Sequence, residues 1–326
     1  MREHLESAIS RLPFFPIDAG GPNISVLLVG MGRSGTTWAG NLINYDRGCR
    51  MVFEPFFPAR VRAARRFEYL QYLHPDYEDP VLAGDARKIL AGNVRSRWID
   101  RENDRWRYRC RMLKDIRCNL MVGWLRRIAN DPPVVVVVRH PLQVVASWAR
   151  LGWGREAVGQ RTDFDIITSQ TRLIEDFPMV SELSKGIDRE DFMERTLFQW
   201  CVFHLVPMTQ LVEGEAYALF YENLLLNFDG EVSHLMQYLG RPFEAEAVRR
   251  AASGASTTNF QKRNFADDKS GLLDGWKQMF SKRQIGRAQE ILSAFGLDEI
   301  YDDNGRPSGI KMFNGPKERK DGERST

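Results

Sequence analysis

The feature that most constrains the fold is the stretch from Ile24 to Ile43, ISVLLVGMGRSGTTWAGNLI. An apolar, β-rich run ends at Gly30, a short loop follows, and the residues from Thr36 onward have helical character. In a strand–loop–helix unit of this kind, backbone N–H groups of the loop and of the helix N-terminus point at one spot and bind an anion there. Arg33 adds a positive charge inside the loop. The stretch therefore predicts a site for a phosphate-type ligand.

The loop differs at one position from the nucleotide-kinase loop G-x-x-x-x-G-K-[ST], whose Lys reaches the terminal phosphates. Gly30 and Gly35 have the kinase spacing and Thr37 supplies a hydroxyl, but Thr36 occupies the Lys position. A small-molecule kinase is therefore the weaker alternative, because its main phosphate-binding cation is missing. A tight turn without any ligand is the other alternative, and the length of the motif argues against it.

A second candidate phosphate site follows the run Pro132–Val138, whose β-branched residues are typical of a strand buried on both faces of a parallel sheet. Arg139 follows directly, and Pro141 suits the first turn of a helix that also contains Ser147. Ligands of open α/β sheets bind at the carboxyl edge of the strands. We therefore expect Arg139 to lie at the same edge as the loop that carries Arg33.

Together the two motifs resemble those of sulfotransferases that use 3′-phosphoadenosine 5′-phosphosulfate (PAPS), with likeness to carbohydrate and bacterial members. The resemblance implies PAPS as co-substrate, no metal, and an electrostatic catalytic role for Arg33 at the leaving oxygen. It implies that the 3′-phosphate contacts Arg139 and Ser147. The residues that it places on the phosphosulfate are Arg33, Ser34, Gly35, Thr36, Thr37 and Trp38. A catalytically inactive nucleotide-binding module is an alternative from a different class.

A looser likeness to cytosolic members lies between residues 251 and 275, which read as a long loop. Thr258-Asn259-Phe260 and Lys269-Ser270-Gly271 are similar to two pieces that close over the nucleotide in that family. The resemblance implies that Phe260 contacts the adenine and that Lys269 contacts the 3′-phosphate. Tyr221 and Glu222 also match a family piece, but a packed Tyr and a helix-start Glu are the better interpretation.

Sulfuryl transfer requires a general base that takes the proton of the acceptor. Cytosolic members use a His after a strand, which the comparable stretch Leu113–Ile116 lacks. Carbohydrate-type members are similar to this chain at Phe53-Glu54-Pro55, so the resemblance implies that Glu54 is the base. A helix-cap or ion-pair role for Glu54 is the alternative, and Asp115 and His140 are the other candidate bases.

The order of strands and helices along the chain predicts an α/β fold with a P-loop-like, mostly parallel sheet flanked by helices on both faces. We expect a sulfotransferase domain over residues 24–300, after an N-terminal extension over 1–23. Residues 151–190 contain no convincing strand and are interpreted as a lid or substrate-side insertion. Residues 301–326 are interpreted as a C-terminal tail that is disordered at its end.

Composition and charge bear on partners and location. A net charge of +3 argues against bulk binding of nucleic acid, and no apolar run approaches the length of a membrane helix. The expected location is cytoplasmic, and a homodimer is one open option. The cysteines, which we interpret as buried or incidental thiols without metal-site spacing, are Cys49, Cys110, Cys118 and Cys201. The acceptor is expected to offer a hydroxyl or amine, and the Arg-rich segment 60–66 suggests either an anionic or sugar-like acceptor or a solvated helix face.

Overall fold

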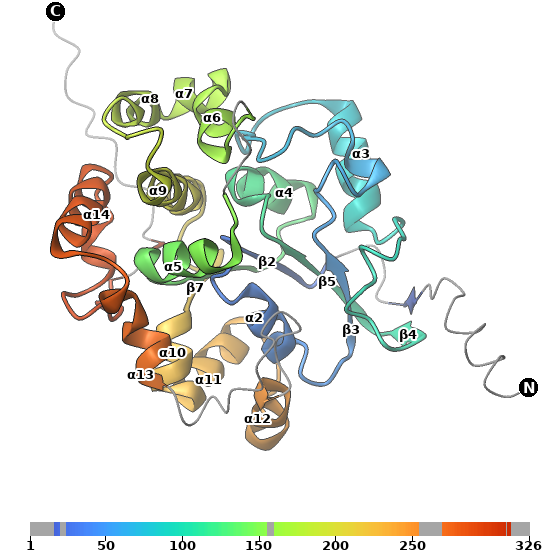
Figure 1. The fold of residues 1–326 in the computed structure, drawn as a ribbon. Coiled ribbons are helices and arrows are strands. Elements are labelled where there is room, and N and C mark those ends of the chain that lie inside the picture. The colour runs from blue at the N-terminus through green and yellow to red at the C-terminus, as the bar shows by residue number, and fades with distance from the viewer. Residues whose placement is uncertain (1–15, 20–23, 155–159, 254–268, 311, 314–326) are drawn as a thin grey trace, which may run out of the picture.

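The chain folds around a five-stranded sheet with the strand order β3-β5-β2-β6-β7, and every neighbouring pair is parallel. The computed structural model describes residues 16–19, 24–154, 160–253, 269–310 and 312–313. The five strands are β2 (Val26–Gly30), β3 (Cys49–Phe53), β5 (Cys110–Asp115), β6 (Val134–Val138) and β7 (Ala216–Phe220). The predicted α/β fold class is therefore confirmed (Figure 1).

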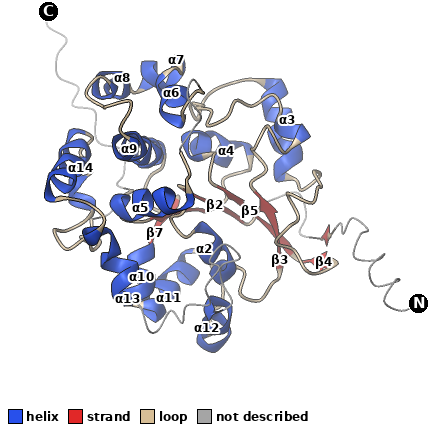
Figure 2. Cartoon of the chain, in the orientation of Figure 1, coloured by secondary structure: helices blue, strands red, loops and turns tan. Residues whose placement is uncertain are grey.

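Helices cover both faces of the sheet, as Figure 2 shows. On one face lie α3 (Pro80–Leu90), α4 (Val122–Ile128), α5 (Pro141–Leu151) and α9 (Phe192–Gln210). On the other lie α2 (Thr36–Ile43), α10 (Tyr221–Leu226), α11 (Phe228–Tyr238) and α12 (Ala245–Ser253). Alternate strand residues belong to the two cores, with Leu27 and Val29 in the first and Val26 and Leu28 in the second. Burial on both faces explains why β2 and β6 read as continuous apolar runs.

Shorter elements complete the chain. Between α5 and α9 lie α6 (Asp163–Thr168), α7 (Thr171–Asp176) and α8 (Pro178–Ser184), so the described part of 151–190 contains no strand, as expected. After α12 come α13 (Lys269–Asp274) and α14 (Lys282–Ala294), and β1 (Ile17–Asp18) pairs with β4 (Arg107–Tyr108). The 3-10 turns are η1 (Arg62–Ala64), η2 (Asn119–Met121), η3 (Gly275–Gln278) and η4 (Asp298–Ile300). The expected loop over 251–275 is thus wrong for 251–253 and 269–274, which are helical.

Several helices begin where a side chain caps them. Asp79 accepts hydrogen bonds from two backbone N–H groups at the start of α3, and Asp191 does the same for α9. Ser281 forms a reciprocal capping box with Gln284 at the start of α14. Such caps pair N–H groups that a helix leaves unpaired at its N-terminus. They explain why α3, α9 and α14 begin directly after Asp79, Asp191 and Ser281.

Two buried arginines on neighbouring strands join β1 to the central sheet. Arg50 of β3 forms ion pairs with Asp100 (2.7 Å) and Asp18 (3.1 Å), and it donates to the Gly92 carbonyl (2.7 Å). Arg111 of β5 also pairs with Asp18. The side chains of both arginines and of Asp18 are almost completely buried. Asp18 lies in the segment that the sequence suggests is an extension, yet it completes a buried charge network of the domain.

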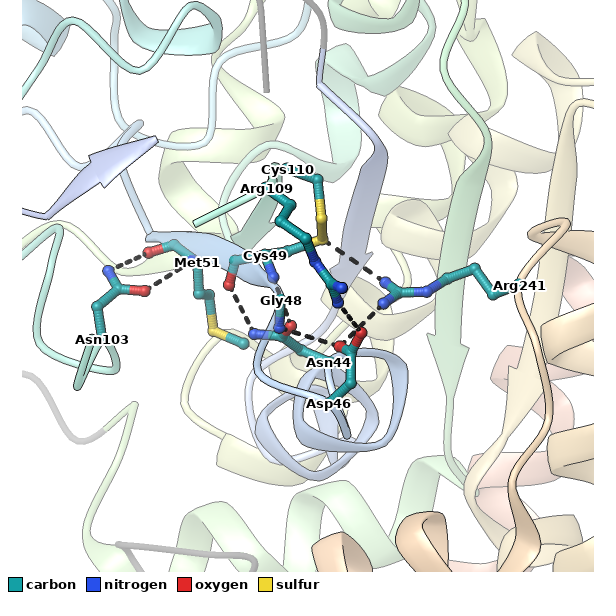
Figure 3. The surroundings of a disulfide bond; sticks show 9 residues. All are labelled: Asn44, Asp46, Gly48, Cys49, Met51, Asn103, Arg109, Cys110 and Arg241. Atoms are coloured by element: carbon teal, nitrogen blue, oxygen red, sulfur yellow. Dashed lines mark hydrogen bonds and ion pairs between the residues drawn. A yellow bond between two sulfur atoms is a disulfide. The ribbon is translucent and has the colours of Figure 1, made fainter. Parts of the chain in front are cut away.

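Cys49 and Cys110 form a disulfide between directly paired positions of β3 and β5. Figure 3 shows the bond beside Asp46, Arg109 and Arg241. The interpretation of these two cysteines as thiols is therefore wrong. The sequence does not indicate the bond, because the cysteines are 61 residues apart and only the pairing of two parallel strands brings them together. Cys118 and Cys201 are free and buried, as expected.

The disulfide is expected to stabilise the fold. A bond that closes a loop of this length restricts the unfolded chain and typically contributes about 2–4 kcal/mol. Replacing both cysteines in the Cys49→Ser/Cys110→Ser variant should lower the free energy of unfolding by that amount in urea titrations. A reductant should destabilise the wild-type chain to the same extent and leave the double variant unchanged. Equal stability of the two proteins without reductant would contradict this role.

Candidate active site

The loop between β2 and α2 has left-handed backbone at two positions, Arg33 (φ 75°) and Gly35 (φ 98°). A side chain at Gly35 would also clash, since an added Cβ would lie 2.6 Å from a ring carbon of Tyr221. The Ser34 hydroxyl is buried and has no hydrogen-bond partner among the described residues. Buried polar groups are almost always paired, so this hydroxyl fits a ligand oxygen at the loop.

The structure brings the second motif into contact with this loop. The Nε of Arg33 donates to the Ser147 hydroxyl of α5 at 3.1 Å. Arg139, which follows β6 directly, donates from its guanidinium to the carbonyl of Arg33 at 3.0 Å. Two segments more than 100 residues apart in the sequence thus meet at the carboxyl edge of the sheet, where the sequence predicts them.

Both arginines remain without an ion-pair partner among the described side chains. Burial lowers the pKa of Arg33, and the neighbouring charge of Arg139 lowers it further. The guanidinium of Arg139 lies over the ring of Tyr221 at 4.2 Å, and its Nε is buried without a hydrogen-bond partner in the part of the chain that the structure describes. Two close cations that form no ion pair among the described residues favour an anion between them, although the buried carboxyl of Glu222 also interacts with Arg139. Tyr221 packs in the core, as expected, and its ring also contacts the guanidinium of Arg139.

The other residues predicted to bind PAPS lie in the helices α2 and α13 or outside the described residues. Thr36 is buried and Thr37 half-buried at the first turn of α2. The ring of Trp38 packs edge-on against Tyr221, with 5.5 Å between centroids, and therefore belongs to the core. Phe260 lies outside the described residues. Lys269 is the first residue of α13, and its side chain also lies outside them.

Two tryptophans that the sequence does not single out support the loop. Trp148 of α5 donates from its indole to the carbonyl of Gly32 at 2.8 Å. Trp153 lies 5.9 Å from the guanidinium of Arg33, measured to the ring centroid. A Cβ added to Gly32 would lie 2.9 Å from the Trp153 ring, so this glycine is needed for close approach. Neither tryptophan belongs to a recognisable motif, so only the fold reveals the contacts.

Glu54 follows β3 and forms two buried ion pairs. Its carboxylate oxygens contact the Lys114 ammonium at 2.7 Å and the Arg117 guanidinium at 2.6 Å. Burial alone would raise the pKa of Glu54, but these two cations hold it below its usual value. A carboxylate with a lowered pKa is a weaker proton acceptor. The assignment of Glu54 as base stays a prediction, and the contacts match the ion-pair alternative.

The two other candidate bases are both buried. Asp115 accepts hydrogen bonds from the backbone N–H groups of Phe56 (2.9 Å) and Arg117 (2.7 Å), and burial raises its pKa to about 6. The ring of His140 stacks on Trp276 with 4.4 Å between centroids, and burial lowers its pKa to about 3. Tyr301 packs edge-on against the same ring. Residue 301, placed at the start of the predicted tail, thus contacts the core.

The parallel sheet, the loop after β2 and the arginine after β6 define an enzyme class that binds nucleotide phosphates at the carboxyl edge of a sheet. Residues 23–296 match the family model of the sulfotransferase domain, so the chain belongs to this family. It is a transferase of sulfuryl groups, as the sequence resemblance predicts. No curated protein sequence matches the chain.

Solved structures with similarity to the chain include the sulfotransferase domain from the curacin biosynthetic pathway, at 19% identity and a TM-score of 0.45. That match covers 83% of this chain and 98% of the other. A mouse sulfotransferase complexed with 3′-phosphoadenosine 5′-phosphate (PAP) is 12% identical, with a TM-score of 0.42, and the match covers 86% of this chain and 85% of the other. Retinol dehydratase in complex with retinol and PAP is 15% identical, with a TM-score of 0.41 and coverage of 90% and 86%.

Proposed function

We propose that the chain transfers the sulfuryl group of PAPS to a hydroxyl or amine of a small-molecule or carbohydrate acceptor. The contact between Arg33 and Ser147 is the observation that carries this proposal. It joins the loop expected to bind the phosphosulfate to the residue expected on the 3′-phosphate. PAPS has anionic groups on the 5′ and the 3′ side of its ribose. Arg33 and Arg139, which form no ion pair within the described part of the chain, match such a ligand.

The proposed chemistry depends on positioning and electrostatics. Negative charge moves to the bridging oxygen as its bond to sulfur breaks. Arg33 stays protonated at any physiological pH, so its role there is to stabilise charge without donating a proton. Ser34, Thr36 and Thr37 would add hydrogen bonds to the phosphosulfate. A metal ion is not required for these steps.

A cavity of about 230 Å³ beside the loop is the proposed acceptor site. Its lining combines aromatic and aliphatic side chains with the polar side chains of Arg117, Asp163 and Gln199. The aromatic and aliphatic residues are Tyr69, Leu70, Ile116, Trp148, Trp153 and Phe203. An acceptor whose hydroxyl or amine is attached to an aromatic or aliphatic group fits such a cavity. The arginines of segment 60–66 do not line the cavity, and Arg66 pairs with Asp85 on α3. The solvated-face alternative for this segment is therefore preferred.

Donor binding and transfer can be tested separately. Calorimetric titration with 3′-phosphoadenosine 5′-phosphate (PAP) should show binding, whereas ATP with Mg²⁺ should bind far more weakly. An acceptor screen with PAPS labelled in the sulfuryl group should then give a labelled product. Binding of ATP with Mg²⁺ in preference to PAP would contradict the proposed donor, whereas PAP binding without any transfer would favour the inactive binding module.

The 3′-phosphate contact gives a separate prediction. Arg139→Ala should weaken PAP binding by about tenfold or more, because a hydrogen bond to a charged group contributes about 1.5–3 kcal/mol. Adenosine 5′-phosphate lacks the 3′-phosphate, so its affinity should change much less in calorimetric titrations. Arg87→Ala, at an exposed arginine of α3, is the matched control and should change neither affinity. Equal losses for both nucleotides would remove Arg139 from the 3′-phosphate.

Location and assembly remain proposals. Among the described residues, no helix is both long and apolar enough to span a membrane. A cytoplasmic location was expected, but the disulfide weighs against it because such bonds persist mainly in oxidising compartments. Trapping the thiols in cells before lysis would show whether Cys49 and Cys110 are joined there. Sedimentation of the purified chain would test the proposed homodimer option.

A further inference from the structure

One carboxylate lines the proposed acceptor cavity. It belongs to Asp163, the first residue of α6, and it shares the cavity with Gly32 of the loop between β2 and α2, the loop proposed to bind the sulfuryl donor PAPS. Asp163 is the only acidic side chain among the described residues that line this cavity. The three bases suggested by the sequence, Glu54, Asp115 and His140, are absent from its walls.

A hydrogen bond to the side chain and a helix cap at the backbone hold Asp163 in place. Gln199 of α9 donates from its amide to one carboxylate oxygen of Asp163 at 3.0 Å. Thr162 caps α6 through a reciprocal pair of hydrogen bonds with Asp165, which fixes the backbone at the start of the helix. Gln199 is itself buried and lines the same cavity. A carboxylate held in this way needs little reorganisation when an acceptor binds.

Several charged or titratable side chains of the described residues share a cavity with Asp163. Tyr69 and Arg117 line the same cavity, and Arg195 of α9 lines a small adjoining cavity together with Asp163. Burial raises the pKa of Tyr69 to about 12, and the charge of Asp163 adds to this effect. Asp163 and Tyr69 therefore line one cavity and interact electrostatically. An acceptor hydroxyl bound in this cavity would share it with the Asp163 carboxylate.

We propose that Asp163 is the general base of this enzyme, an inference that depends on the proposed sulfuryl transfer from PAPS. The acceptor hydroxyl gives its proton to the Asp163 carboxylate while its oxygen forms a bond to sulfur. The bond from sulfur to the bridging phosphate oxygen breaks, and its electron pair stays on the PAP product. Asp163 then returns the proton to solvent, which balances the step.

Glu54 differs from Asp163 in position. The carboxylate of Glu54 is enclosed by Lys114 and Arg117 and does not line the cavity, whereas Asp163 does. Glu54 instead holds Arg117, whose guanidinium also stacks over Phe57 at 4.0 Å and lines the cavity. Glu54 is therefore a positioning residue for the cavity wall in this scheme.

The test compares Asp163→Asn with the wild-type chain, using labelled PAPS and two acceptors. The acceptors are 2-naphthol, whose hydroxyl is protonated at neutral pH, and water, whose sulfation releases inorganic sulfate. Asp163→Asn should slow both transfers by about 100-fold or more, whereas PAP affinity should stay within about twofold. Asp163→Glu, which keeps a carboxylate, should recover at least about tenfold of the loss. Glu175→Gln, at an exposed carboxylate of α7, is the matched control and should be unaffected.

The pH profile separates a base from a structural residue. The wild-type kcat/KM should rise with pH as the carboxylate ionises, and this rise should be lost in Asp163→Asn and kept in Glu54→Gln. Transfer within about threefold of wild type by Asp163→Asn, or loss of the rise only in Glu54→Gln, would overturn the inference. A wild-type chain that binds PAP but transfers to neither acceptor, nor to any acceptor of the screen, would overturn the proposed function, whereas the result for Asp163→Asn alone overturns this inference.

Discussion

Replacing Arg33 by Ala is expected to lower turnover by about 100-fold to 1000-fold while the chain stays folded, because removal of one preorganised donor commonly has an effect of this size. Arg33 belongs to the loop between β2 and α2, its side chain contacts Ser147, and its charge is not compensated by an ion pair among the described residues. Its contribution therefore belongs mainly to the charge that develops on the leaving oxygen. Steady-state kinetics with labelled PAPS would measure the loss.

The backbone makes Arg33→Ala a clean comparison. Arg33 adopts a left-handed φ of 75°, which is unfavourable for any residue with a Cβ, so arginine and alanine bear the same backbone cost. Arg33→Lys serves as the partner variant, since it keeps the charge but loses the planar fork, and its turnover should fall between the two. Turnover of Arg33→Ala within about threefold of wild type would exclude the proposed role.

Replacing Asp18 by Asn is expected to lower the free energy of unfolding by about 3–5 kcal/mol, because it removes a charged carboxylate that two buried arginines share. Arg50 and Arg111 both form ion pairs with Asp18, and Arg50 also pairs with Asp100. Asp104→Asn is the matched control, because Asp104 pairs with Arg47 at a largely exposed site. Its effect should stay below about 1 kcal/mol in the same urea titrations.

The same network predicts a pH dependence of stability. Burial alone would raise the pKa of Asp18, but hydrogen bonds and charges from Arg111 and Arg50 hold it below its usual value. The folded chain thus binds this proton less readily than the unfolded chain does, so the contribution is complete above the unfolded pKa of about 4. It is lost as the pH falls through the lower folded pKa. Asp18→Asn should lack this acid-side loss, and an identical pH dependence in both proteins would contradict the assignment.

The sequence predicts β2 and β6 well, because both are buried on both faces and contain no charged residue, whereas β3 and β5 contain charged residues. It also predicts that Arg33 and Arg139 share one sheet edge, since each follows a parallel strand. The Cys49–Cys110 bond and the Asp18 network depend on which strands become neighbours, and strand order is not visible in local patterns. Asp163 is harder still, because it reaches the cavity through the packing of α6 on α9 and belongs to no motif.

The disulfide and the Glu54 cluster lie at opposite ends of the same two strands. Pairing of Cys49 with Cys110 puts Phe53 opposite Lys114, and Glu54 then donates from its N–H to the Lys114 carbonyl at 2.7 Å. A slip of one residue between parallel strands would turn every side chain to the other face. The covalent bond prevents that slip, so it fixes the register of β3 and β5 and thereby the position of the cavity wall that includes Arg117. A bond at the amino ends of β3 and β5 thus maintains the geometry of the acceptor cavity at their carboxyl ends.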